Sequence, residues 1–75
     1  MGGNIVENNF SHIHILKDCI IDRKDNVILC TFEKKRYKNV YKYTADRVPG
    51  VFNTKDEIRD RIINLLKEDR FSLTV

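Results

Sequence analysis

Hydrophobic and polar residues alternate from Phe10 to Asp22, with Ile13, Ile15, Cys19 and Ile21 at odd positions. A period of two is typical of a β-strand. Polar residues fill positions 23–26, where Asp and Asn tolerate the left-handed backbone of a short loop. Val27 to Phe32 is the expected return strand. We therefore expect a β-hairpin with strands at about 10–22 and 26–33.

A four-residue loop fixes the pairing of these two strands. It places Asp22 opposite Val27, Ile21 opposite Ile28 and Cys19 opposite Cys30. Residues directly opposite each other share a face of the sheet. This register predicts one hydrophobic face, made of Ile13, Ile15, Cys19, Ile21, Ile28, Cys30 and Phe32. The even positions of the first strand, which include His12, His14 and Ile20, are expected on the other face.

The segment 34–48 fits two templates. As a strand, it places its three tyrosines on one face and Arg36, Lys38 and Lys42 on the other. As a helix, its apolar residues recur at three- and four-residue intervals and stop before Pro49. Tyrosine and β-branched residues favour strands, so we expect a third strand at about 36–44. The helix over 34–48 remains the alternative.

The pattern changes to a helical one after Pro49-Gly50, which predicts a turn. Thr54 and Glu57 have the spacing of a capping box. An apolar stripe of Ile58, Ile62, Leu65 and Leu66 extends the helix to about 54–69. Residues 70–75 alternate and predict a short edge strand. The expected fold is α+β: a three-stranded antiparallel β-meander packed by one C-terminal amphipathic helix, with an edge strand at the end.

Length and composition limit the class of protein. A chain of 75 residues has room for one domain, expected at 10–75 after a flexible leader at 1–9 that is rich in glycine and asparagine. Hydrophobic residues at 41% and charged residues at 33% are typical of a folded chain. Two cysteines without a C-x-x-C motif indicate a cytoplasmic protein. The apolar runs are shorter than the roughly 18 residues that span a membrane, so we expect no membrane partner.

Two histidines in His12-x-His14 and two cysteines have the chemistry of a zinc site. The expected register places the histidines and the cysteines on opposite faces, so we expect no metal and no cofactor. The same separation argues against a Cys-His hydrolase. Phosphate-binding loops and the common hydrolase motifs are absent from the sequence. We therefore expect a binding protein that is not an enzyme and has no small-molecule substrate.

Between Lys34 and Lys42 lie five basic residues and no acid, in a chain of net charge +3. Basic side chains neutralise phosphates, and tyrosine rings stack on unpaired bases. The segment 34–43 therefore predicts binding of nucleic acid, either RNA or a single strand. The expected binding residues are Lys34, Lys35, Arg36, Tyr37, Lys38, Tyr41, Lys42 and Tyr43.

Two other interpretations of the segment 34–43 remain open. The tyrosines can be packing residues while the lysines protect a sheet edge from aggregation. Alternatively, exposed tyrosines and an arginine can anchor a larger protein partner, which would make the chain a regulator or a stoichiometric inhibitor of a larger complex. The sequence leaves the identity of the partner and the oligomeric state open.

The residues Tyr41-Lys42-Tyr43, followed by Val48-Pro49 and Val51-Phe52, resemble the central Y-x-Y and V-P segment of the KTSC domain. That small module occurs alone or appended to lysyl-tRNA synthetases, and the resemblance implies RNA binding. It covers about a third of the chain. This sequence departs from the family in the insertion at 44–47, in its long charged helix and in lacking the family's S-x-G turn. No residue roles are transferred from the family.

Overall fold

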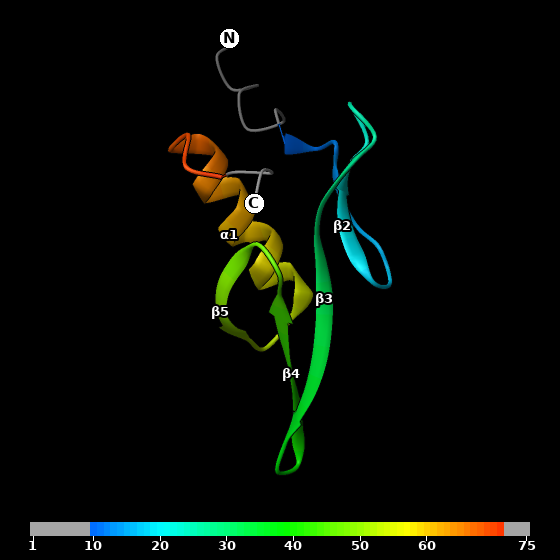
Figure 1. Ribbon diagram of the computed structural model, residues 1–75, viewed down its shortest axis with the longest axis vertical. Coiled ribbons are helices and arrows are strands. Elements are labelled where there is room, and N and C mark those ends of the chain that lie inside the picture. Colours follow the sequence, from blue (N-terminus) through cyan, green and yellow to red (C-terminus); the bar gives the residue numbers. More distant parts are fainter. Residues whose placement is uncertain (1–9, 72–75) are drawn as a thin grey trace, which may run out of the picture.

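The computed structural model describes residues 10–71, which form a five-stranded antiparallel sheet and one helix (Figure 1). The strands are β1 (Ile13–Ile15), β2 (Cys19–Asp22), β3 (Val27–Tyr37), β4 (Val40–Ala45) and β5 (Val48–Phe52), and the helix is α1 (Lys55–Lys67). Neighbouring strands in the sheet are consecutive in the chain, so the sheet is a meander. The expected α+β fold with a C-terminal helix is confirmed, whereas the prediction of three strands is wrong. The expected leader at 1–9 lies outside the described residues.

The first expected strand, 10–22, is two strands. The backbone turns between β1 and β2, where Leu16 N–H donates to the carbonyl of Cys19 at 2.8 Å. The polar pair Lys17-Asp18 occupies this turn. Pairing of β1 with β2 brings Ile15 opposite Ile20. This pairing puts the odd residues of β1 on the same face as the even residues of β2, whereas one continuous strand would put the odd residues of both on one face.

The pairing of β2 with β3 begins as expected and then shifts. Ile21 lies opposite Ile28, but Ile20 lies opposite Cys30, so Leu29 is an extra residue in β3. One extra residue in one strand of a pair is a β-bulge. The expected pairing of Cys19 with Cys30 is therefore wrong, and Cys19 faces Thr31.

The β1–β2 turn and the bulge together decide which residues are buried. Ile20 and Cys30 are fully buried and Leu29 nearly so, whereas Ile28 is 53% exposed. The predicted hydrophobic face was wrong in including Ile28 and in leaving out Ile20. Ile15 pairs with Ile20, so the β1–β2 turn puts Ile20 on the same face as Ile13, and the bulge adds Cys30 to that face. Ile28 keeps its expected partner Ile21 and lies on the other face.

The segment 34–48 is neither a helix nor one strand. β3 continues to Tyr37, the chain turns at Lys38-Asn39, and β4 returns antiparallel to β3. Lys38 adopts the left-handed conformation, with φ of 56°, as such a tight turn requires. The expected single strand at 36–44 is therefore wrong. In the paired strands β3 and β4, backbone N–H and C=O groups bond to each other, whereas a single edge strand would leave them to bond with water.

Pro49-Gly50 lies inside β5 and not in the expected turn. β5 pairs with β4 and ends the strand order of the sheet, and an edge strand tolerates proline because its outer N–H groups are not needed for pairing. The preceding turn is at Asp46-Arg47. There the N–H of Thr31 donates to Asp46 Oδ1 at 2.9 Å, which fastens the turn to β3.

Helix α1 begins after Thr54 as the sequence predicted. Glu57 N–H donates to Thr54 Oγ1 at 3.2 Å, and the Glu57 carboxylate accepts from Asn53 N–H at 2.9 Å. The helix ends at Lys67, two residues before the expected end. The edge strand expected at 70–75 falls largely on residues 72–75, which lie outside the described residues, and residues 70–71 are not in a strand.

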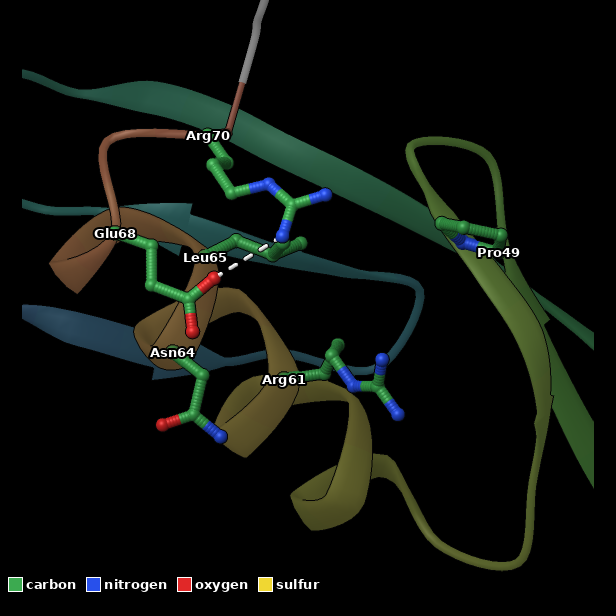
Figure 2. Close-up of a pocket in the computed structure, with 6 residues that line it drawn as sticks. All are labelled: Pro49, Arg61, Asn64, Leu65, Glu68 and Arg70. Atoms are coloured by element: carbon green, nitrogen blue, oxygen red, sulfur yellow. Dashed lines mark hydrogen bonds and ion pairs between the residues drawn. The ribbon is translucent and has the colours of Figure 1, made fainter.

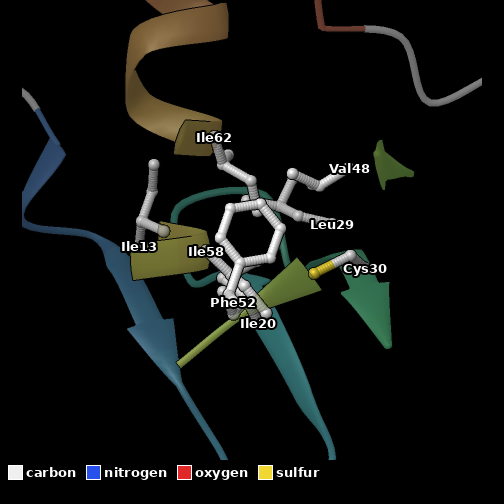
Figure 3. Close-up of a cluster of buried hydrophobic side chains, with 8 residues drawn as sticks. All are labelled: Ile13, Ile20, Leu29, Cys30, Val48, Phe52, Ile58 and Ile62. Atoms are coloured by element: carbon white, nitrogen blue, oxygen red, sulfur yellow. The ribbon is translucent and has the colours of Figure 1, made fainter. Parts of the chain in front are cut away.

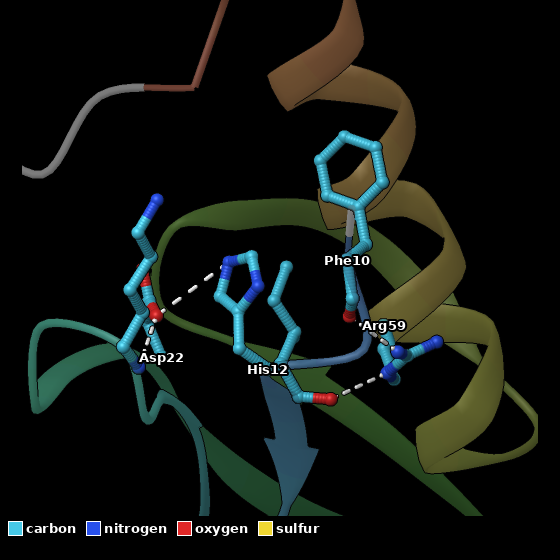
Figure 4. A network of polar contacts seen from close by, with 6 residues as sticks. Phe10, His12, Asp22 and Arg59 are labelled. Carbon is cyan, nitrogen blue, oxygen red and sulfur yellow. Dashed lines mark hydrogen bonds and ion pairs between the residues drawn. The ribbon is translucent and has the colours of Figure 1, made fainter. Parts of the chain in front are cut away.

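The helix packs against β5 and β1, the two edge strands of the sheet. Between helix and sheet lies the core shown in Figure 3, formed by Ile13, Ile20, Leu29, Cys30, Val48, Phe52, Ile58 and Ile62. Arg59 joins the helix to the backbone near β1, because its guanidinium donates to the carbonyls of Ile13 at 2.8 Å and Phe10 at 2.9 Å (Figure 4). Within residues 10–71, α1 is too short and too polar to cross a membrane.

Candidate nucleic-acid interface

The β3–β4 hairpin contains the whole basic and tyrosine-rich segment 34–43. Figure 1 shows its turn at the lower end of the molecule, away from helix α1. The described residues extend over 49 × 28 × 21 Å, and the hairpin lies along the long direction. The outer part of the hairpin is therefore a two-stranded ribbon that other molecules can approach.

Strand pairing divides the segment into two faces. Lys34 lies opposite Tyr43, and Arg36 lies opposite Tyr41. Opposite residues point to the same side of a sheet, so these four side chains share one face, which we call the basic-tyrosine face. The expectation that the tyrosines and the basic residues lie on opposite faces is wrong for these four, because it assumed a single strand where the chain turns back.

The exposed part of the basic-tyrosine face is built around Tyr41. Tyr41 is 54% exposed, and Lys34 Nζ lies 4.8 Å from the centroid of its ring. A cation at this distance from an aromatic ring is attracted to the ring face. A flat aromatic surface and two cations, Lys34 and Arg36, are thus presented side by side to solvent.

Tyr43 has a different environment from Tyr41. It is half-buried and packs against the hydrophobic core, with its ring centroid 6.5 Å from that of Phe32 in an edge-to-face arrangement. Such aromatic pairs stabilise packing. Of the two tyrosines on this face, Tyr43 anchors the base of the hairpin and Tyr41 remains accessible.

The other side of the hairpin, which we call the far face, carries the remaining site residues except Lys38. Lys35 lies opposite Lys42, and Tyr37 lies opposite Val40. Both lysines have local partners: Lys35 Nζ is 3.8 Å from Glu33 Oε1, and Lys42 Nζ donates to Asn53 Oδ1 at 2.5 Å. Glu33 therefore compensates part of the positive charge of the far face, whereas Asn53 is neutral and only holds the Lys42 ammonium in place.

Lys38 lies in the hairpin turn between the two faces. Its backbone carbonyl accepts from Arg36 Nε at 3.2 Å, which holds the arginine near the tip. The structure thus brings Lys34, Arg36, Tyr41 and Tyr43 together and separates them from Lys35, Tyr37 and Lys42.

Sequence reasoning missed one cation beside this site. Lys55, the first residue of α1, places Nζ 5.2 Å from the ring centroid of Phe32 and 5.7 Å from that of Tyr43. It is twelve residues beyond Tyr43 in the chain, and no local pattern links the two. Only the packing of the helix against the sheet brings Lys55 to the basic-tyrosine face.

The cysteines and histidines, whose chemistry would suit a zinc or hydrolase site, do not belong to the basic-tyrosine face. Cys30 is fully buried, and desolvation with help from the Asp46 carboxylate raises the pKa of its thiol to about 11. A thiol with so high a pKa is protonated at neutral pH and is a poor nucleophile. His12 Nε2 lies 3.6 Å from Asp22 Oδ1 (Figure 4). Within residues 10–71, no three His, Cys, Asp or Glu side chains are grouped so that they could hold a metal ion.

A groove lies between β5 and the C-terminal half of α1 (Figure 2). Its lining residues are Pro49, Arg61, Asn64, Leu65, Glu68 and Arg70. Arg70 donates to Glu68 Oε1 at 3.4 Å, so an acid already compensates part of the charge in the groove. The groove is therefore less suited to phosphate than the basic-tyrosine face.

Comparison with known proteins does not assign the chain to a family. No family model matches it, and no curated protein and no solved structure matches it either. The likeness of Tyr41–Phe52 to the KTSC domain accordingly remains a resemblance of short motifs, and the functional argument depends on the geometry of this chain.

Proposed function

We propose that this protein binds nucleic acid, RNA or a single strand, through the basic-tyrosine face of the β3–β4 hairpin, and that it acts by binding and not by catalysis. The observation that carries the proposal is the register of the hairpin, which places Lys34, Arg36 and the exposed ring of Tyr41 on one face. An aromatic platform beside a row of cations is the usual construction of a surface for unpaired nucleotides.

Each of these residues has a role in the proposed complex. Arg36 presents a planar guanidinium that can make two parallel hydrogen bonds to a phosphate, and Lys34 supplies a point charge. The Tyr41 ring, on which the Lys34 ammonium rests, can instead receive a base while the lysine moves to the neighbouring phosphate. Base stacking of this kind contributes roughly 1–3 kcal/mol per base.

The electrostatic setting supports the same partner. No acidic residue occurs between Lys34 and Ala45, so the outer hairpin has a concentrated positive charge in a chain whose other charges are mixed. Such a local field attracts polyanions and accelerates their association. On the far face Glu33 weakens this field, which favours the basic-tyrosine face as the contact surface.

Titration of labelled single-stranded oligonucleotides at several salt concentrations tests the proposal. Affinity should fall with salt by a log–log slope of about 0.7 per phosphate contacted. The double variant Lys34→Gln, Arg36→Gln should lower the slope by about 1.4, because two phosphate contacts are lost. The matched double variant Lys35→Gln, Lys42→Gln removes the same charge from the far face and should have less than half this effect.

Tyr41 provides the second part of the same test. Tyr41→Ala should weaken binding by roughly 5- to 150-fold, equivalent to the loss of one stacked base, whereas Tyr41→Phe should retain most of the affinity. Tyr37→Ala, on the far face, is the control for this change. Equal losses from the two faces, or no oligonucleotide binding by the unaltered protein, would contradict the proposal.

A protein partner is the alternative, and one observation favours it. Tyr37 and Val40 form an opposite pair on the far face and are 42% and 52% exposed. Exposed aromatic residues are common anchors of protein interfaces. A partner captured from lysate after nuclease treatment and lost with Tyr37→Ala, but not with Tyr41→Ala, would support this alternative.

A further inference from the structure

The basic-tyrosine face continues from the hairpin onto the body of the protein. Phe32, Lys34 and Arg36 occupy alternate positions of β3, so their side chains point to the same side of the sheet. Phe32 is at the base of the hairpin, where its ring meets Tyr43. The Lys55 ammonium from helix α1 lies over both of these rings, at 5.2 and 5.7 Å.

This arrangement places three cations in sequence along the hairpin. Alternate residues of a strand are separated by roughly 6.6 Å, so Arg36, Lys34 and the level of Phe32 follow one another at even intervals. Lys55 supplies the charge at the level of Phe32. The rings of Tyr41 and Tyr43 lie beside these cations, since each tyrosine is opposite a basic residue in the register.

Lys55 has local contacts as well. Its ammonium donates to the carbonyl of Lys17 at 2.6 Å, which links the helix to the β1–β2 turn. Asp56 and Glu57 follow it in the first helical turn, and the Glu57 carboxylate is held by Asn53 N–H. A cation in the first turn opposes the helix dipole, so helix stability alone does not account for lysine at this position.

We infer that Lys55 is a third phosphate contact of the basic-tyrosine face, and that a bound nucleic-acid strand runs along the hairpin from Arg36 past Lys34 to the start of α1. This inference rests on the proposed function. The bound nucleic acid must then lie along the long axis of the hairpin. A nucleic acid that crossed the hairpin would reach only one of the three cations.

Lys55→Gln and Lys67→Gln form a matched pair that tests the inference. Each lysine is in α1 with its ammonium over a phenylalanine ring, Phe32 for Lys55 and Phe10 for Lys67. With a single-stranded oligonucleotide, Lys55→Gln should lower the salt slope by about 0.7, so that its deficit in affinity grows about fivefold for each tenfold reduction in salt. Lys55→Arg and Lys67→Gln should retain the slope of the unaltered protein.

A measurement on the unaltered protein avoids any effect of Lys55→Gln on folding. Acetylation of surface lysines by an N-hydroxysuccinimide ester, mapped by mass spectrometry, should show Lys55 and Lys34 protected by bound oligonucleotide while Lys67 reacts as before. If Lys34 is protected and Lys55 is not, the inference fails and the proposed function stands. If the oligonucleotide does not bind and protects no lysine, the proposed function itself fails.

Discussion

The thiol of Cys30 shows how the surroundings of one residue set its chemistry. Its side chain is fully buried opposite Ile20 in the core, and desolvation, followed by the nearby Asp46 carboxylate, raises the thiol pKa from 9.0 to about 11. Both causes disfavour the thiolate. Cys30 therefore serves as a small apolar residue and not as a reactive one.

The shifted pKa of Cys30 predicts a pH dependence of stability. Between about pH 9 and pH 11 the thiol ionises in the unfolded chain but stays protonated in the folded one, so the unfolded state binds fewer protons. The free energy of unfolding should therefore fall as pH rises through this range, and the contribution should be fully present below pH 9. Urea denaturation at pH 7, 9 and 10 measures it.

Cys30→Ala is the control for this measurement, because it lacks the titrating thiol and keeps every other ionisable group. Its free energy of unfolding should be lower than that of the unaltered protein at pH 7, and the difference should narrow above pH 9. If the two pH profiles stay parallel, the burial of Cys30 does not perturb its pKa.

At the scale of elements, the β1–β2 turn determines which side of β2 lies on the core, because it puts Ile20 and not Ile21 on the face of Ile13. Ile20→Ala should cost roughly 2–5 kcal/mol in free energy of unfolding, because the residue is fully buried and its removal leaves a cavity. Ile28→Ala, in the neighbouring strand, should cost about 0.5 kcal/mol or less, because its side chain is 53% exposed. Chemical denaturation of the two variants, made from the same residue type, compares the sites directly.

The reverse order of these two costs would show that the opposite side of the β2–β3 pair lies on the core. In that arrangement Ile28 and its partner Ile21 face the core and Ile20 faces solvent, as counting from the four-residue loop predicts. Equal and small costs would mean that neither strand packs closely against α1. The pair of variants thus tests which face of β2 and β3 is buried, independently of any binding experiment.

At the scale of the whole molecule, Arg59 links helix α1 by hydrogen bonds to the backbone at and before the edge strand β1. Arg59→Gln should lower the free energy of unfolding by roughly 1.5–3 kcal/mol, because the guanidinium donates to the backbone carbonyls of Phe10 and Ile13. Arg61→Gln, two residues further along the same helix, is exposed and should change it by about 0.5 kcal/mol or less. Thermal or urea unfolding of both variants measures the difference, and equal effects would contradict this role of Arg59.

Local chemistry in the sequence was enough to predict several parts of the structure. The Thr54–Glu57 spacing predicted the start of α1, and residues 23–26 predicted the turn between β2 and β3 and the two residue pairs nearest to it. The α+β class with a meander and a C-terminal helix followed from the same patterns. These features depend on contacts between residues a few positions apart, which a short stretch of sequence specifies.

The tertiary structure decided which residues of each strand share a face of the sheet and which residues make up the candidate site. The turn at Lys38-Asn39 and the bulge at Leu29 each alter which side chains share a face, and neither interrupts the hydrophobic pattern enough to be read from it. Folding back at Lys38 brings Lys34 opposite Tyr43, and packing of α1 adds Lys55. The sequence alone determined that the basic residues and tyrosines occur together in one segment. Their arrangement on one face required backbone pairing and helix packing between residues far apart in the chain, which no local pattern encodes.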